Sequence, residues 1–118
     1  MLDFVAVDKA LINDYANSYY HKDAEYFLIR KGEETAGIFG IKKISKTAGE
    51  MTLLIFENFK HGVLTKTTCK QLLNFPKLLG FGTVFLATQY QSMIKLCHRF
   101  GMQYLYDHNG ESWYKKEL

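Results

Sequence analysis

The stretch that decides the fold is Leu53–Gln71, LLIFENFKHGVLTKTTCKQ. Its apolar start belongs to a predicted strand, Glu50–Glu57. A break follows at Asn58–Gly62, and then a helical pattern runs over Val63–Leu79, with Pro76 expected to kink or end the helix. A glycine-bearing loop between a strand and a helix presents free backbone N–H groups and the positive end of the helix dipole. The stretch therefore predicts a strand–loop–helix unit suited to holding phosphate oxygens.

The rest of the chain extends this unit in both directions. Asp8 offers an N-cap for an amphipathic helix over residues 8–20. A second helix is predicted over Gln89–Phe100, with Gly101 as its stop. Its expected inward stripe is Tyr90, Met93, Ile94 and Cys97. Further strands are expected at Leu2–Val7, Glu25–Lys31, Thr35–Lys43, Thr83–Thr88, Met102–Tyr106 and Ser112–Lys116.

These elements predict one α/β (mixed α+β) domain over residues 1–118. Its central, mostly antiparallel sheet of about six to seven strands is flanked by helices. The chain has 118 residues, of which 47% are hydrophobic and 23% charged, as in a globular domain with a core. No apolar run approaches the roughly 20 residues that a membrane-spanning helix needs.

Charge and cysteine content narrow the functional classes. The formal net charge is +3, which is too mild to indicate a nucleic-acid binder. No secretory signal is visible, and Cys69 and Cys97 are expected to be free thiols in the cytoplasm. The four histidines have no paired ligand spacing, so no metal site is predicted. They are His21, His61, His98 and His108.

Two segments together resemble the GCN5-related N-acetyltransferase (GNAT) superfamily. One is Leu53–Gln71, and the other is Thr88–Leu105, TQYQSMIKLCHRFGMQYL, which is similar to the family's closing helix and strand. The resemblance implies acetyl-CoA as donor, bound by a loop that reads Q/R-x-x-G-x-G/A in the family. With Gly62 as the first glycine, Phe59 stands at the Gln/Arg position and Leu64 at the second glycine or alanine.

The resemblance assigns the loop residues to the cofactor. Lysines at positions 60, 66 and 70 and the imidazole of His61 add positive charge beside the loop. A strand-to-helix turn with ordinary solvated lysines is the alternative interpretation. The residues expected to bind acetyl-CoA are Phe56, Asn58, Lys60, His61, Gly62, Val63, Leu64, Thr65 and Lys66.

The resemblance also implies catalytic groups. A carboxylate near the central strand removes the proton from the substrate ammonium. Glu57 is the first candidate for this base because it adjoins the loop, and Glu50 is the second. The family's acid is a tyrosine four residues before the glycine that ends the last helix, a position that Cys97 occupies here. Tyr90, two helical turns earlier, is the substitute, and a core-facing thiol is the alternative interpretation of Cys97.

Two functions from different classes follow. The first is an acyl-CoA-dependent N-acetyltransferase that acts on an amine-bearing small molecule or protein. The second is a non-catalytic GNAT-like binding or assembly module with a protein partner, as in compact proteins of tailed phages. An aromatic C-terminal hairpin offers a surface for such a partner or for a homodimer. Its residues are Tyr104, Tyr106, Trp113 and Tyr114.

Overall fold

The computed structural model describes residues 2–8, 23–59 and 65–118. The helix predicted over residues 8–20 lies outside these residues except at Asp8. Within them the strands are β1 (Leu2–Ala6), β2 (Ala24–Lys31), β3 (Glu34–Lys43), β4 (Ala48–Ile55), β5 (Thr83–Thr88), β6 (Gln103–His108) and β7 (Glu111–Glu117). The helices there are the short 3-10 helix η3 (Glu57–Phe59), α3 (Lys66–Leu78) and α4 (Gln91–Arg99).

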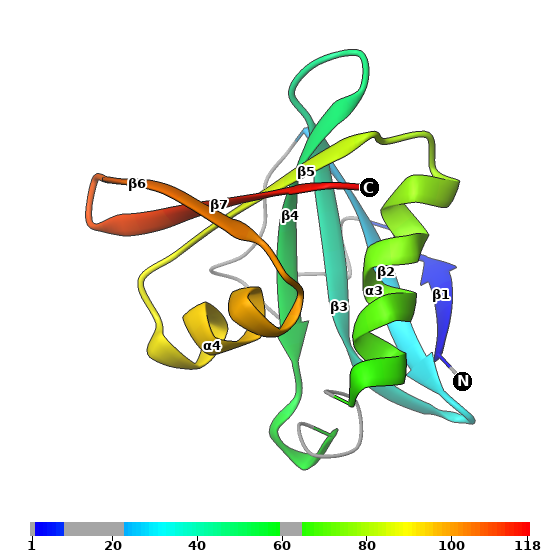
Figure 1. Ribbon diagram of the computed structural model, residues 1–118. Coiled ribbons are helices and arrows are strands. Elements are labelled where there is room, and N and C mark those ends of the chain that lie inside the picture. Colours follow the sequence, from blue (N-terminus) through cyan, green and yellow to red (C-terminus); the bar gives the residue numbers. More distant parts are fainter. Residues whose placement is uncertain (1, 9–22, 60–64) are drawn as a thin grey trace.

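The strands form one seven-stranded sheet in the order β1-β2-β3-β4-β5-β7-β6. Among the described strands only β4 and β5 run parallel, and every other neighbouring pair is antiparallel. Helices α3 and α4 lie over the same face of the sheet (Figure 1). The predicted fold class, a mostly antiparallel sheet flanked by helices, is therefore confirmed.

The predicted strands match closely, with one exception. The strand expected at Glu50–Glu57 begins and ends two residues earlier, so Glu57 lies in η3 rather than in the sheet. Strand β4 begins early because the turn before it is tight: the N–H of Ile44 donates to the carbonyl of Ala48 at 3.0 Å. It ends early because the N–H of Phe59 donates to the carbonyl of Phe56 at 2.9 Å, which closes a helical turn.

Helix α3 begins later and continues past its proline. Thr65 caps it, since its Oγ1 accepts a hydrogen bond from the N–H of Thr68 at 3.3 Å. Pro76 is buried inside the last turn, and the helix ends two residues later at Leu78. Proline has no backbone N–H, so α3 lacks one hydrogen bond at this position. The loss falls in the last turn, where other backbone groups also have no partner within the helix, so α3 tolerates it.

Helix α4 is shorter than predicted, and one member of its stripe was assigned wrongly. Tyr90 is the N-cap of α4, has extended backbone angles and is 56% exposed, so it does not face the core. Cys97 is fully buried, while Met93 and Ile94 pack against the core half-buried. Gly101 has φ +71°, the left-handed conformation that ends helices and favours glycine.

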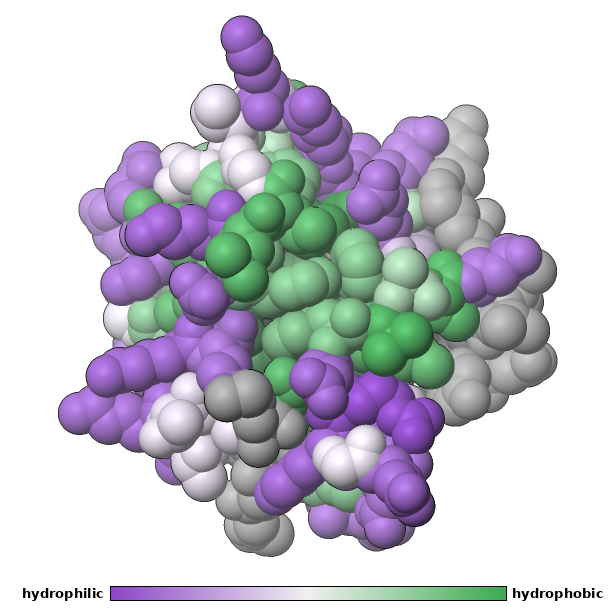
Figure 2. Space-filling view, turned by 90° about the vertical axis from the view of Figure 1, so that its right-hand side faces the viewer, coloured by the Kyte–Doolittle hydropathy of each residue, from purple (hydrophilic) through white to green (hydrophobic). Residues whose placement is uncertain are grey.

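Phenylalanines join α3 to the sheet. The ring of Phe75 stacks on Phe4 of β1 at a centroid distance of 4.1 Å and meets Phe39 of β3 edge-on at 5.4 Å. Figure 2 faces the side of the molecule that carries β1 and α3, and it shows an apolar area enclosed by hydrophilic residues. Leu78, at the end of α3, is 74% exposed.

The C-terminal hairpin forms as predicted. A two-residue turn of Asn109 and Gly110, both with positive φ, joins β6 to β7. Tyr104 and Tyr106 on β6 are about half exposed, whereas Tyr114 on β7 is buried against α4. Only part of the predicted aromatic surface is therefore open to a partner.

We expect Gly37→Ala to destabilise the fold by about 1–3 kcal/mol, because a Cβ there would clash with the backbone oxygen of Leu54 in β4. Gly82→Ala is the matched control, since its Cβ would meet only the oxygen of Thr47, at 3.9 Å. Its stability should stay within about 0.5 kcal/mol of the wild type. Urea unfolding of both variants measures the difference, and equal stabilities would contradict the close approach of β3 and β4.

Candidate active site

Strands β4 and β5 touch only at their beginnings. Their pairs are Ala48–Thr83, Gly49–Val84 and Glu50–Phe85. Both strands are fully described, and neither forms a further pair with the other beyond Glu50 and Phe85. Each remains paired on its outer side, β4 with β3 and β5 with β7 along its whole length. The two strands therefore diverge toward their carboxyl ends, and the sheet opens into a V (Figure 1).

A cavity of about 550 Å³ occupies the divergence. Its walls come from β4, from β5 and from the start of α4. Its described lining residues are Ala24, Lys42, Glu50, Met51, Thr52, Leu53, Leu86, Ala87, Thr88, Gln89, Tyr90, Met93 and Glu111. We call this cavity the cleft.

The structure places Tyr90 in the wall of the cleft. Thr88, which is only 5% exposed, accepts a hydrogen bond on Oγ1 from the N–H of Tyr90 at 3.1 Å. This bond fixes the backbone at the point where β5 passes into α4. The backbone of Tyr90 is therefore anchored to a buried residue, while its phenol side chain remains exposed.

Carboxylates reach the cleft from β4 and β7. Glu50 is half-buried in the wall, and Glu111 approaches from β7. Glu57 is exposed in η3 and is not among the described residues that line the cleft. Sequence reasoning ranked Glu50 second and missed Glu111, because only the strand register shows that both lie beside the divergence.

Cys97 is a buried residue of α4 and does not line the cleft. Burial raises the pKa of its thiol to about 11, because the thiolate would lose its water. On the same side of the sheet, the rings of His98 and Tyr114 meet edge-on at 5.9 Å, where α4 packs over β7. Cys97 is thus part of the packing between helix and sheet.

The loop residues are dispersed. Phe56 packs against the apolar cluster of Ala24, Tyr26 and Ile38, and Phe59 packs against the main core. Asn58 is exposed in η3 and Lys66 is exposed at the first position of α3. Thr65 caps that helix. The other expected cofactor-binding residues, Lys60, His61, Gly62, Val63 and Leu64, lie outside the described residues.

Residues 2–8, 23–59 and 65–118 show neither a membrane-spanning helix nor a metal-binding cluster. No helix there is long and apolar enough to cross a bilayer. No group of three or more histidine, cysteine, aspartate or glutamate side chains there could hold a metal ion.

Comparison with solved structures identifies the fold. Over 99% of both chains it matches the N-acetyltransferase PseH of Campylobacter jejuni in complex with acetyl coenzyme A, with 13% identity and a TM-score of 0.77. The spermidine/spermine N-acetyltransferase SpeG of Vibrio cholerae matches with 11% identity and a TM-score of 0.75, over 99% of this chain and 95% of that one. A GNAT family acetyltransferase of Elizabethkingia anophelis with acetyl-CoA bound matches over 99% of this chain and 98% of that one, with 13% identity and a TM-score of 0.70.

These likenesses establish the class of the fold. The chain has the fold of the GNAT acetyltransferases, as the two sequence segments predicted. The sequence itself matches no protein-family model and no curated protein.

We expect the buried thiol of Cys97 to make stability depend on alkaline pH. Its pKa is raised in the folded state, from 9.0 to about 11, so the neutral thiol stabilises the fold below pH 9. That contribution is lost as the pH rises from 9 toward 11. The urea concentration at the midpoint of unfolding should therefore fall as the pH rises through this range. It should fall less steeply in Cys97→Ala than in the wild type. Equal slopes would mean that Cys97 ionises as freely in the folded as in the unfolded chain.

Proposed function

We propose that the protein is an N-acetyltransferase that moves an acetyl group from acetyl-CoA to an amine in the cytoplasm. The observation that carries this proposal is the separation of β4 and β5 beyond Glu50 and Phe85, with a cleft of about 550 Å³ between them. A closed seam filled by side chains would leave no room for a pantetheine arm. The acetyl-CoA complexes of proteins with this fold support the choice of donor.

Strand β4 is the natural support for the donor. Beyond Glu50 its backbone polar groups on the side of β5 have no partner in that strand, so they can bond to the amides of a pantetheine arm. The segment from Phe56 to Lys66 follows directly and would hold the pyrophosphate, with the start of α3 contributing its dipole.

The cleft also offers groups for both proton transfers. We assign Glu50 as the base that takes a proton from the acceptor ammonium, and Glu57 is the alternative base. The free amine attacks the thioester carbon, the C–S bond breaks, the attacking nitrogen loses its second proton to water, and the products are an N-acetyl amide and CoA. We assign Tyr90 as the acid that returns a proton to the departing sulfur. Cys97 is the weaker candidate because it is buried outside the wall.

The acceptor would be an amine, in keeping with the spermidine/spermine N-acetyltransferase that shares the fold. Glu50 and Glu111 give the cleft two carboxylates against the one ammonium of Lys42 among its described lining residues. That balance favours a cationic acceptor.

A binding module without catalysis remains the second candidate. Two observations favour it: the half-buried Phe59 packs against the core instead of presenting a polar group, and Cys97 occupies the acid position of the family while buried. The exposed Tyr104 and Tyr106 would then belong to a protein interface.

Binding of the donor separates the two candidates. Acetyl-CoA at a hundredfold excess over Kd should stabilise the protein by about 2.7 kcal/mol, which for this size raises the melting temperature on the order of 5–15 °C. Ala87→Phe places a ring in the cleft wall and should abolish the shift, whereas Ala6→Phe, at an exposed position of β1, should keep it. A wild-type protein that does not respond to millimolar acetyl-CoA would favour the binding module.

Turnover tests the assigned groups. Glu50→Gln and Tyr90→Phe should each lower kcat by about a hundredfold while the donor Kd changes little, because they remove proton transfer and not donor contacts. Glu57→Gln is measured beside them. A large loss in Glu57→Gln with normal turnover in Glu50→Gln would transfer the role of base to Glu57.

A further inference from the structure

The two carboxylates of the cleft come from positions that lie well apart in the sheet. Glu50 pairs with Phe85 in the last step of the β4–β5 ladder. Further along β5, Thr88 pairs with Ser112 of β7, so Glu111 lies opposite the residue that follows Thr88. The backbone positions of the two glutamates are therefore four residues apart along the direction of β5. This separation corresponds to roughly 13 Å of strand.

The wall of the cleft between these carboxylates is apolar. It contains the buried side chains of Met51 and Leu53 from β4 and of Leu86 from β5. Ala87 and Met93 extend the apolar wall toward the start of α4. Burial of methylene groups against such side chains is favourable. A linear molecule with a hydrocarbon chain and a cation at each end therefore matches the order of charge and apolar surface in the cleft.

The two glutamates differ in their surroundings. Lys42 lies opposite Glu50 in the β3–β4 ladder, and it is the one cationic side chain among the described lining residues of the cleft. The carboxylate of Glu111 has no ion-pair or hydrogen-bond partner in the part of the chain that the structure describes. Glu50, the proposed base, takes a proton from an amine that is neutral when it attacks. Glu111 is thus the carboxylate suited to a cation that keeps its charge.

The C-terminal hairpin fixes the position of Glu111. Glu111 pairs with His108 across the two-residue turn, and next to this pair Oγ of Ser112 donates a hydrogen bond to Oδ1 of Asp107 at 2.8 Å. Glu111 is half-buried although it adjoins a turn. A carboxylate on a fixed backbone loses little conformational freedom when it binds a ligand, so it can discriminate between acceptors of different length.

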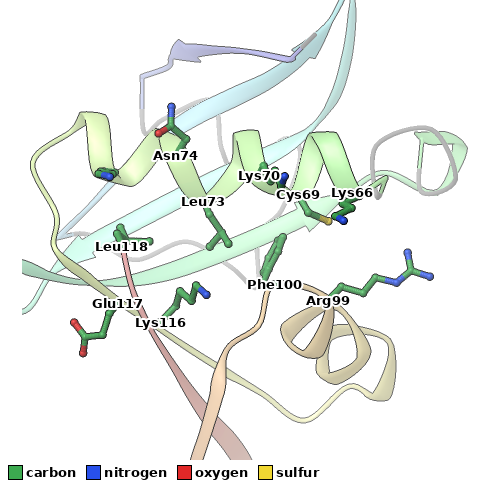
Figure 3. Close-up of a pocket in the computed structure, with 11 residues that line it drawn as sticks. Lys66, Cys69, Lys70, Leu73, Asn74, Arg99, Phe100, Lys116, Glu117 and Leu118 are labelled. Atoms are coloured by element: carbon green, nitrogen blue, oxygen red, sulfur yellow. The ribbon is translucent and has the colours of Figure 1, made fainter.

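A second large cavity has the opposite balance of charge. It measures about 710 Å³ and lies between α3 on one side and the end of α4 and β7 on the other (Figure 3). Four lysines and Arg99 line it, and Glu117 is the one side-chain carboxylate among its described lining residues. Glu117 already forms an ion pair with Lys115 at 3.0 Å. This cavity repels a dication, whereas the cleft attracts one.

We propose that Glu111 is a specificity-determining residue that selects linear diamines as acceptors. The amine to be acetylated lies beside Glu50, the hydrocarbon chain lies on the apolar wall, and the second ammonium pairs with Glu111. This assignment rests on the proposed function and narrows the acceptor from an amine to a diamine. The nitrogens of extended 1,5-diaminopentane are roughly 7 Å apart. The two glutamate side chains bridge the rest of the roughly 13 Å between their backbone positions.

Steady-state acetylation by the full chain tests the assignment with 1,5-diaminopentane and pentylamine, which share a chain length and differ by one ammonium. The wild-type kcat/KM should be at least about tenfold higher for the diamine, which exceeds the factor of about two that two equivalent amines give. Glu111→Gln should reduce this preference below about threefold. The loss should appear as a higher KM for the diamine, with little change in kcat, because Glu111 takes no part in proton transfer.

A shorter side chain provides a second readout. Glu111→Asp withdraws the carboxylate by about one methylene length, so the preferred diamine should shift from 1,5-diaminopentane toward 1,6-diaminohexane. A loss of the preference for diamines of every length in Glu111→Asp would contradict a role of Glu111 in measuring the acceptor.

The matched control is Glu34→Gln, which removes the same charge from an exposed position of β3 that does not line the cleft. It should keep the wild-type preference. Equal kcat/KM of the wild type for 1,5-diaminopentane and pentylamine would overturn the diamine assignment and leave the transferase in place. A preference that survives Glu111→Gln would overturn the role of Glu111. If the wild type acetylates neither amine, both the transferase and this assignment are wrong.

Discussion

The structure depends on a short seam between two half-sheets. β1 to β4 form one half and β5 to β7 the other. Three strand pairs, from Ala48–Thr83 to Glu50–Phe85, join them, and just before these pairs the N–H groups of Gly82 and Thr83 donate to the carbonyl of Thr47. Extending the ladder would satisfy more backbone groups but would close the cleft. The fold keeps the V because β3 and β7 already hold the outer sides of β4 and β5, so each strand is stable without its neighbour's second half.

Side-chain packing compensates for the short seam. Phe75 of α3 meets the first half-sheet through Phe4 and Phe39, and Cys97 of α4 is buried over the second. Both helices contribute to one apolar cluster that also contains residues of β4 and β5. Nonpolar contacts are not directional, so they can hold two strands at a widening distance where hydrogen bonds cannot. The cleft can therefore stay open above a continuous core.

Most of the fold, but only part of the candidate site, could be predicted from the sequence. Hydrophobic alternation and turn residues such as Asn109–Gly110 located the described strands to within about two residues, because those signals are local. The end of the β4–β5 ladder is set by pairing between segments more than 30 positions apart, so no local pattern reveals it. That is why Glu57 ranked above Glu50. Tyr90 was predicted to face inward because helical spacing does not show where the helix begins.

The two half-sheets also face each other across the cavity of about 710 Å³ that lies outside the cleft. One wall of this cavity is α3, which packs on the first half-sheet, and the other consists of Arg99, Phe100 and β7, which belong to the second. A ligand that bridges these walls binds only when the half-sheets keep their relative position, so its binding energy is added to that of the seam.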